Sequence, residues 1–150
     1  MLQEILHVGL TVADLDRSVA FYRDVLGLEF QGELFMEGPE TELLFARPGT
    51  RARVAYLRGK GLLEGPPVEL IQFVPPDILR EPGDLFRSSI SEICFQTADI
   101  RAAYETLRAR GVEFLSEPQA FDFSKDGFGK SLAVYFRDPD GIILELMQPL

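Results

Sequence analysis

Leu6-His7-Val8-Gly9-Leu10-Thr11-Val12-Ala13-Asp14-Leu15 is the stretch that decides the fold, because a related stretch follows later in the same chain. The second copy reads Ser91-Glu92-Ile93-Cys94-Phe95-Gln96-Thr97-Ala98-Asp99-Ile100. Each copy runs into a segment whose apolar residues recur at helical spacing. Each half then closes on a related strand-like segment, Val68-Glu69-Leu70-Ile71-Gln72 or Leu144-Glu145-Leu146-Met147-Gln148. The repetition predicts two copies of one structural module.

The hydrophobic patterns follow the same order in both halves: a strand, a helix and three strands. In the first half we expect a strand at 5–12 that is buried on both faces, a helix at 15–26, and strands at 28–36, 51–57 and 68–73, with a further strand or part of a long hairpin at 42–46. In the second half we expect strands at 90–97, 112–115, 131–137 and 142–147, a helix at 100–110 and a polar loop at 116–130. The predicted fold class is α+β, with a first βαβββ module at 1–74, a linker at 75–88 and a second βαβββ module at 89–150.

Composition narrows the class of protein. With 150 residues, 46% hydrophobic and 26% charged, the chain is typical of a soluble globular protein. No apolar run approaches the roughly 18 residues of a membrane span. A net charge of -9 argues against nucleic acid as a partner and suits metal ions or cationic small molecules. The single cysteine, Cys94, and the lack of a signal-like N-terminus predict a cytoplasmic protein, and the apolar neighbours of Cys94 favour an inert, buried thiol.

Four polar residues stand at positions that the repeat relates in pairs. The offset of 85 residues that aligns Asp14 with Asp99 also aligns His7 with Glu92. The closing strands align at an offset of 76, which pairs Glu69 with Glu145. A carboxylate in a strand covered on both faces costs several kcal/mol unless a metal, a cation or hydrogen bonds compensate it. Each residue alone reads as structural, but the repeat-related quartet predicts a metal site.

At this point the chain resembles the vicinal oxygen chelate superfamily. This group contains glyoxalase I, methylmalonyl-CoA epimerase, extradiol dioxygenases, fosfomycin-resistance enzymes and bleomycin-binding proteins. The resemblance covers nearly the whole chain, and its most specific motifs are His7-Val8-Gly9-Leu10-Thr11-Val12, Phe21-Tyr22-Arg23-Asp24-Val25-Leu26-Gly27-Leu28 and Tyr135-Phe136-Arg137-Asp138-Pro139-Asp140-Gly141. It implies a glyoxalase-like fold in which the two modules pair into a curved, half-open mixed sheet.

The resemblance also implies the metal ligands, which come from the first and last strands of each module. They fall on His7, Glu69, Glu92 and Glu145. Metal-binding relatives commonly have histidine where this chain has Glu92. One imidazole and three carboxylates favour Mn, Fe, Co, Ni or Mg over Zn. The alternative is that Glu92 marks a disarmed site with no metal.

The function expected first is a metal-dependent lyase or isomerase of the glyoxalase or epimerase type. Its substrate would present two adjacent oxygens, and the metal would stabilise an enediolate or enolate formed by proton loss. Glu145 is the candidate base, with Glu69 as its counterpart for the reverse transfer. The loop at 121–130 is expected to close over the site, with Phe128 and Lys130 as substrate contacts.

Two other functions stay open. A metal-free protein of the bleomycin-resistance type would hold a cationic small molecule in an acidic groove. A dioxygenase is disfavoured, because its facial triad needs two histidines and the chain has one. We expect a homodimer, and the sequence leaves open whether a site forms within one chain or across the dimer.

Overall fold

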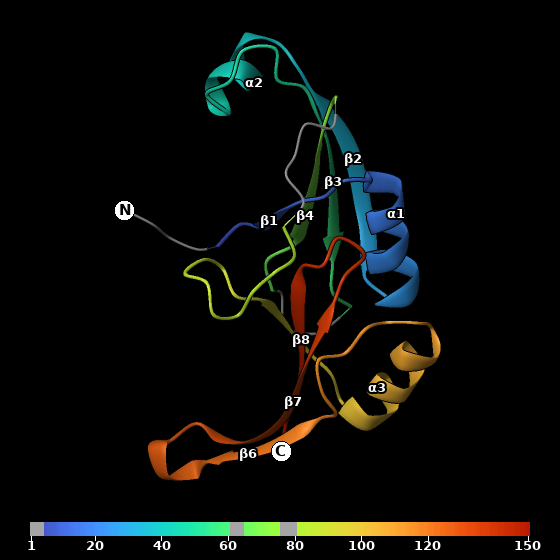
Figure 1. The fold of residues 1–150 in the computed structure, drawn as a ribbon, viewed down its shortest axis with the longest axis vertical. Helices are drawn as coiled ribbons and strands as arrows, with labels where there is room; N and C mark the ends of the chain where they lie inside the picture. The colour runs from blue at the N-terminus through green and yellow to red at the C-terminus, as the bar shows by residue number, and fades with distance from the viewer. Residues whose placement is uncertain (1–4, 61–64, 76–80) are drawn as a thin grey trace. The chain divides into compact units, whose positions relative to one another are not determined.

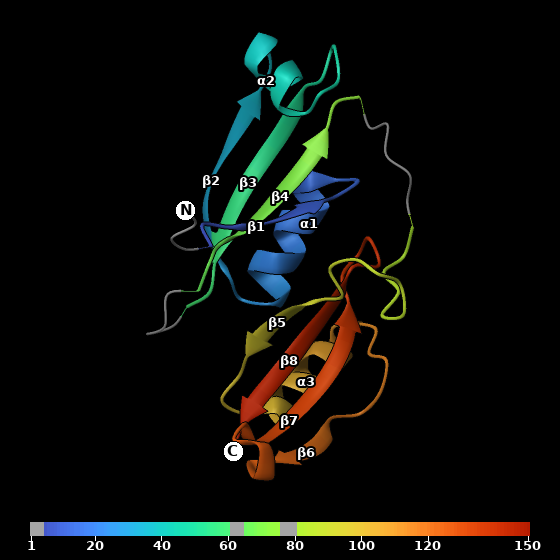
Figure 2. The ribbon, with the colours of Figure 1, turned by 90° about the vertical axis from the view of Figure 1, so that its left-hand side faces the viewer.

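The computed structural model describes residues 5–60, 65–75 and 81–150. The chain divides into two compact units, Met1–Arg80 and Glu81–Leu150. Each unit contains one four-stranded mixed sheet with a helix on one of its faces (Figures 1 and 2). The predicted α+β fold class is confirmed. No helix in the described parts of the chain is long and apolar enough to cross a membrane.

The described residues of unit 1 form four strands and two α-helices. In chain order they are β1 (Val8–Thr11), α1 (Leu15–Ala20), the π-helical turn η1 (Phe21–Val25), β2 (Glu29–Met36), α2 (Pro39–Leu44), β3 (Ala52–Arg58) and β4 (Val68–Phe73). The sheet order is β1-β4-β3-β2, with β1 parallel to β4 and the other pairs antiparallel. Side chains alternate along each strand, so the buried Leu10, Ala55 and Leu70 lie on the face that α1 covers. The opposite face carries Glu69 and Tyr56.

Unit 2 repeats this plan. Its elements are β5 (Ile93–Gln96), α3 (Ile100–Ala109), β6 (Gln119–Phe123), the 3-10 turn η2 (Ser124–Asp126), β7 (Gly129–Arg137) and β8 (Ile143–Pro149). The sheet order is β5-β8-β7-β6, the same connectivity as in unit 1. Tyr104 of α3 packs edge-on against Phe114 at 4.7 Å between ring centroids, and Phe114 contacts Phe136 of β7 at 5.5 Å. This aromatic column joins α3 to the sheet face opposite Glu145.

Both helices begin in the same way, which shows how far the repeat extends. Asp14 caps α1 by accepting a hydrogen bond from the Arg17 amide, and Asp99 caps α3 from the Ala102 amide, each at 3.0 Å. A glutamine from the last strand of each unit adds a second contact to the start of its helix. Gln72 Oε1 accepts a hydrogen bond from the Leu15 amide, and Gln148 Oε1 accepts one from the Ile100 amide, both at 2.9 Å. The strand that carries each glutamate therefore also positions its helix.

Three predicted elements are wrong. The segment 42–46 is not a further strand, because α2 runs over Pro39–Leu44; proline in the first turn and acidic residues near the N-terminus favour a helix. The alternative of a long hairpin agrees with the structure, since β2 and β3 pair antiparallel on either side of this segment. The strand at 112–115 reduces to one isolated bridge between Phe114 and Phe136. The fourth strand of the sheet is instead β6, inside the predicted polar loop, where Phe121 and Phe123 alternate with polar residues.

Two smaller differences concern boundaries. The first strand is shorter than 5–12, and it is not buried on both faces, because Leu10 is buried while its neighbours Gly9 and Thr11 are exposed. The beginning of unit 2 lies within the predicted 75–88 linker. The Gly83 amide donates to the Gly141 carbonyl at 2.9 Å, which ties this part of the linker to unit 2.

The glutamine contact to the α1 N-terminus predicts a loss of stability on its removal. Gln72→Ala leaves the amide of the fully buried Leu15 without its acceptor, which we expect to lower the free energy of unfolding by about 1–3 kcal/mol. Urea denaturation measures the change. Gln96→Ala, a loss of the same side chain at an exposed strand position, is the control. Equal destabilisation by both variants would show that the contact contributes nothing.

Candidate functional site

The first candidate group consists of His7, Tyr56 and Glu69 and is called the unit 1 group. Strand register builds it: Glu69 of β4 is paired with Gly9 of β1 on one side and with Tyr56 of β3 on the other. These positions share the face opposite α1, and His7, two residues before Gly9, follows the same alternation. Three segments of the chain, the one that leads into β1, β3 and β4, thus meet around one carboxylate.

Both oxygens of the Glu69 carboxylate have partners. His7 Nε2 lies 3.3 Å from Glu69 Oε2, and the Tyr56 hydroxyl donates a short hydrogen bond to Oε1. The His7 and Tyr56 rings are in edge contact, with 6.0 Å between centroids. The Glu69 side chain is only 12% exposed, whereas the His7 side chain is 44% exposed, so the imidazole faces solvent and the carboxylate lies behind it. The group is arranged to present one imidazole nitrogen and one carboxylate oxygen together.

Gly9 explains how Glu69 fits beside β1. A Cβ atom at this position would lie 3.1 Å from Glu69 Oε2, closer than an ordinary van der Waals contact. The absence of a side chain therefore lets the carboxylate lie against the backbone of β1. The hydrogen bond from Tyr56, together with burial and the charge of Glu69, raises the pKa of Tyr56 to about 12. Tyr56 stays a neutral donor throughout the physiological range.

The unit 1 group fits two adjacent ligands of a divalent metal. Metal–nitrogen and metal–oxygen distances of about 2.0–2.2 Å place neighbouring ligand atoms about 3 Å apart. The 3.3 Å between His7 Nε2 and Glu69 Oε2 is close to that spacing. Tyr56 holds the second oxygen of Glu69, as outer partners of metal-binding carboxylates do. Within residues 5–60, 65–75 and 81–150, no three His, Cys, Asp or Glu side chains form a ready-made metal cluster.

The second candidate group consists of Glu92, Cys94, Tyr135 and Glu145 and is called the unit 2 group. Glu145 of β8 is paired with Cys94 of β5 and with Tyr135 of β7, as Glu69 is paired with Gly9 and Tyr56. Glu145 is 8% exposed. Where unit 1 has a glycine beside its glutamate, unit 2 has a thiol, and Cys94 hydrogen-bonds Glu145.

Negative charge and burial act together on this group. Burial, the hydrogen bond to Glu145 and the charges of Glu145 and Glu92 raise the pKa of Cys94 to about 12. Burial and the same two carboxylates also raise the pKa of Tyr135. Both side chains therefore stay neutral at physiological pH. The Cys94 residue keeps an exposed part, so the prediction of a buried thiol is wrong, but its sulfur is desolvated enough, beside two carboxylates, for the thiol to stay protonated.

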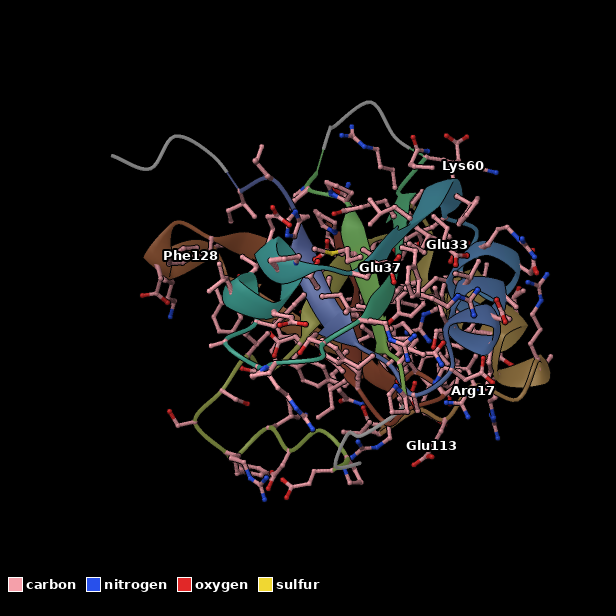
Figure 3. All side chains as sticks on the ribbon, turned by 90° about the horizontal axis from the view of Figure 1, so that it is seen from above. Arg17, Glu33, Glu37, Lys60, Glu113 and Phe128 are labelled. Atoms are coloured by element: carbon pink, nitrogen blue, oxygen red, sulfur yellow. The ribbon has the colours of Figure 1, made fainter. Side chains whose placement is uncertain are left out.

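The structure places the two predicted substrate contacts away from the unit 2 group. Phe128 is 85% exposed and lies at the outer end of the β6–β7 hairpin (Figure 3). Lys130 is five residues before Tyr135 on β7, so alternation puts it on the other face, where its Nζ lies 3.0 Å from Asp122. The segment predicted as a closing loop is a paired hairpin. The geometry of unit 2 thus lends no support to these two residues.

Sequence reasoning missed the two tyrosines that flank the glutamates. Their signal is a repeated Tyr-x-Arg pattern, Tyr56-Leu57-Arg58 and Tyr135-Phe136-Arg137. The pattern lies in the third strand of one module and the corresponding strand of the other. Its meaning depends on strand register, because only pairing with β4 and β8 brings the phenols beside the carboxylates.

Comparison with known proteins extends these observations. A family model described as "Glyoxalase/Bleomycin resistance protein/Dioxygenase superfamily" matches residues 4–146. The chain is 34% identical over 149 residues to a 2-epi-5-epi-valiolone epimerase from an Actinomyces species, covering 94% of this chain and 76% of that protein. It is 30% identical over 145 residues to a lactoylglutathione lyase from Haemophilus influenzae, covering 97% and 92%. A glyoxalase family protein from Bacillus cereus shares the fold, with a TM-score of 0.84 at 20% identity, covering 100% of this chain and 96% of that one.

The setting of Cys94 predicts slow alkylation of an exposed thiol. With a pKa of about 12, only about one ten-thousandth of Cys94 is thiolate at pH 8, so its rate with iodoacetamide should keep rising above pH 10. Glu145→Gln removes a charge and a hydrogen bond that disfavour the thiolate, and should raise the rate at pH 8 by roughly an order of magnitude. Glu117→Gln, an exposed glutamate outside the group, is the control. A wild-type rate that levels off near pH 9 would contradict the assigned electrostatics.

Proposed function

We propose a proton-transfer function for this chain, which belongs to the Glyoxalase/Bleomycin resistance protein/Dioxygenase superfamily. In this proposal the protein is a metal-dependent lyase or isomerase of the glyoxalase or epimerase type. Its substrate is a small molecule with two adjacent oxygens, and the proton leaves the carbon beside a carbonyl. The observation that carries the proposal is the pairing of His7 Nε2 and Glu69 Oε2, 3.3 Å apart, with Tyr56 bound to the other carboxylate oxygen.

The proposed metal ligands are His7 and Glu69 of unit 1 and Glu92 and Glu145 of unit 2. The donor set is one imidazole and three carboxylates, which favours Mn, Fe, Co, Ni or Mg over Zn. When bound, a divalent metal polarises the substrate's adjacent oxygens and makes the neighbouring C–H more acidic. A homodimer is part of the same proposal.

Glu145 is the proposed base. Its neighbours Cys94 and Tyr135 are neutral at physiological pH, so no cation pairs with it in the unit 2 group. The thiol that it does contact is a weak hydrogen-bond donor and holds the carboxylate less firmly than a hydroxyl would. Glu69, in contrast, is held at both oxygens by His7 and Tyr56. We therefore give the first proton transfer to Glu145 and keep Glu69 as its counterpart for the return transfer.

A metal-free binding protein is the second candidate. The presence of Glu92 in place of the histidine common in metal-binding relatives favours it, as does the net charge of -9, which suits a cationic ligand. Metal content separates the two candidates. A dioxygenase stays disfavoured because the chain has one histidine.

The proposed ligand set predicts bound metal that depends on His7. We expect protein purified without chelator to contain close to one first-row metal ion for each site, and His7→Ala to lose it. Elemental analysis by plasma mass spectrometry measures the content. Glu117→Gln serves as the control with an unaltered group. Metal absent from the natural protein but acquired by Glu92→His would establish the disarmed site instead.

The role of Glu145 predicts a loss of proton exchange. Candidate substrates are the hemithioacetal of methylglyoxal with glutathione, and 2-epi-5-epi-valiolone, chosen from the names of the two relatives. Exchange of the hydrogen beside the carbonyl in deuterium oxide is followed by NMR. Glu145→Gln should slow it by about 10²–10⁴-fold, the usual contribution of a positioned base. Undiminished exchange in this variant, with Glu69→Gln inactive, would transfer the role to Glu69.

A further inference from the structure

A pocket of about 400 Å³ adjoins the unit 1 group. Strands β2 and β3 provide most of its lining, and Tyr56 belongs both to the pocket and to the group. A register shift between Phe30 and Gly32 marks a β-bulge in β2 beside it. Gly32 has a φ of 145°, and nothing lies within 4 Å of where its Cβ would be. The bulge and the glycine keep the space in front of Tyr56 open.

Arg58 is the positive charge of this pocket. It follows Tyr56 by two residues on β3, so alternation places it on the face that carries Glu69. From strand geometry its Cα lies about 8 Å from that of Glu69. Arg58 is exposed, and its cross-strand neighbour in β2 is Glu29, although no ion pair joins Arg58 to a carboxylate among the described residues. Glu33, the acid that lines the pocket, is engaged elsewhere, because its Oε1 lies 2.7 Å from Arg53 Nε.

The equivalent arginine of unit 2 is engaged in side-chain hydrogen bonds, which Arg58 lacks within the described parts of the chain. Arg137 follows Tyr135 in the same Tyr-x-Arg pattern. Its Nη1 donates to the carbonyl oxygens of Gly83 at 3.1 Å and Gly141 at 2.9 Å, and its Nε lies 3.8 Å from Glu113. Arg137 thus has a structural role in joining the first residues of unit 2 to the β7–β8 turn. Arg58 has no such role, and it faces a pocket.

We infer that Arg58 and this pocket bind an anionic group of the substrate, a carboxylate or a phosphate, at the end remote from the adjacent oxygens. The inference rests on the proposed function for the position of those oxygens, near His7 and Glu69. A guanidinium offers two parallel donors to such an anion, which gives geometric selection as well as charge. In a chain with net charge -9, this local positive charge selects an anionic substrate against the overall field.

The test compares two α-keto acids that differ at their remote end. 2-Oxoadipate carries a second carboxylate, and 2-oxohexanoate ends in a methyl group; both present adjacent oxygens. Calorimetric titration with protein loaded with Mn²⁺ gives the two dissociation constants. We expect the wild type to bind 2-oxoadipate about tenfold more tightly, and Arg58→Gln to lose this preference. Arg51→Gln removes the same charge from an exposed position just before β3 and should keep the preference.

Each result separates the two proposals. Equal affinity of the wild type for both acids, or a preference that survives in Arg58→Gln, overturns the role of Arg58 and leaves the proposed function in place. His7→Ala should weaken both acids alike, because it removes a metal ligand. If His7→Ala binds both acids unchanged while Arg58→Gln loses the preference, the anion pocket is supported and the proposed metal site is wrong. Failure of the wild type to bind either acid contradicts both. Unchanged unfolding temperatures confirm that the variants are folded.

Discussion

The rest of the structure depends on a buried carboxylate in the last strand of each module. An ionised glutamate beside sheet backbone and apolar side chains is costly unless neighbouring strands supply hydrogen bonds or charge. In unit 1, β3 contributes the Tyr56 hydroxyl, which donates to one carboxylate oxygen, and the segment before β1 places the His7 imidazole beside the other. Gly9 supplies the space. Strand order, register and glycine placement therefore all serve one side chain.

The two units hold their buried glutamates with different partners. Glu69 has a phenol hydrogen bond and an imidazole, and Glu145 has a thiol partner with a second carboxylate, Glu92, near enough to act on Cys94 and Tyr135. The first arrangement orients its carboxylate through both oxygens. The second places two carboxylates near Cys94 and Tyr135 and keeps both of these side chains protonated. Glu69 is thus held at both oxygens, whereas the thiol beside Glu145 is a weak donor, and the proposed division of labour between the two glutamates follows from this difference.

Most of the fold was predictable because it repeats. The strand at 68–73 and the helix after Asp99 were predicted from their hydrophobic periodicity, and both are present in the structure. The order of helices and strands expected in the second half could be checked against that of the first. The prediction of secondary structure failed in two short segments, where local sequence effects and strand pairing outweighed the hydrophobic pattern. Pro39 and two nearby glutamates began a helix in a segment of ambiguous period. Phe121 and Phe123 formed a strand among polar residues, because pairing with β7 satisfied their backbone.

For the candidate site, the sequence by itself determined which residues to consider. The repeat offsets singled out His7, Glu69, Glu92 and Glu145, because equivalent positions in two copies of a module occupy equivalent places in its sheet. Only the tertiary structure decided which neighbours those residues have. Tyr56 and Cys94 lie 13 and 51 residues from the glutamates they contact, and pairing between strands, which no local pattern encodes, brings them together. Tertiary contacts also decided that Arg137 is bound to backbone carbonyls while Arg58 faces an open pocket, although both stand in the same three-residue pattern.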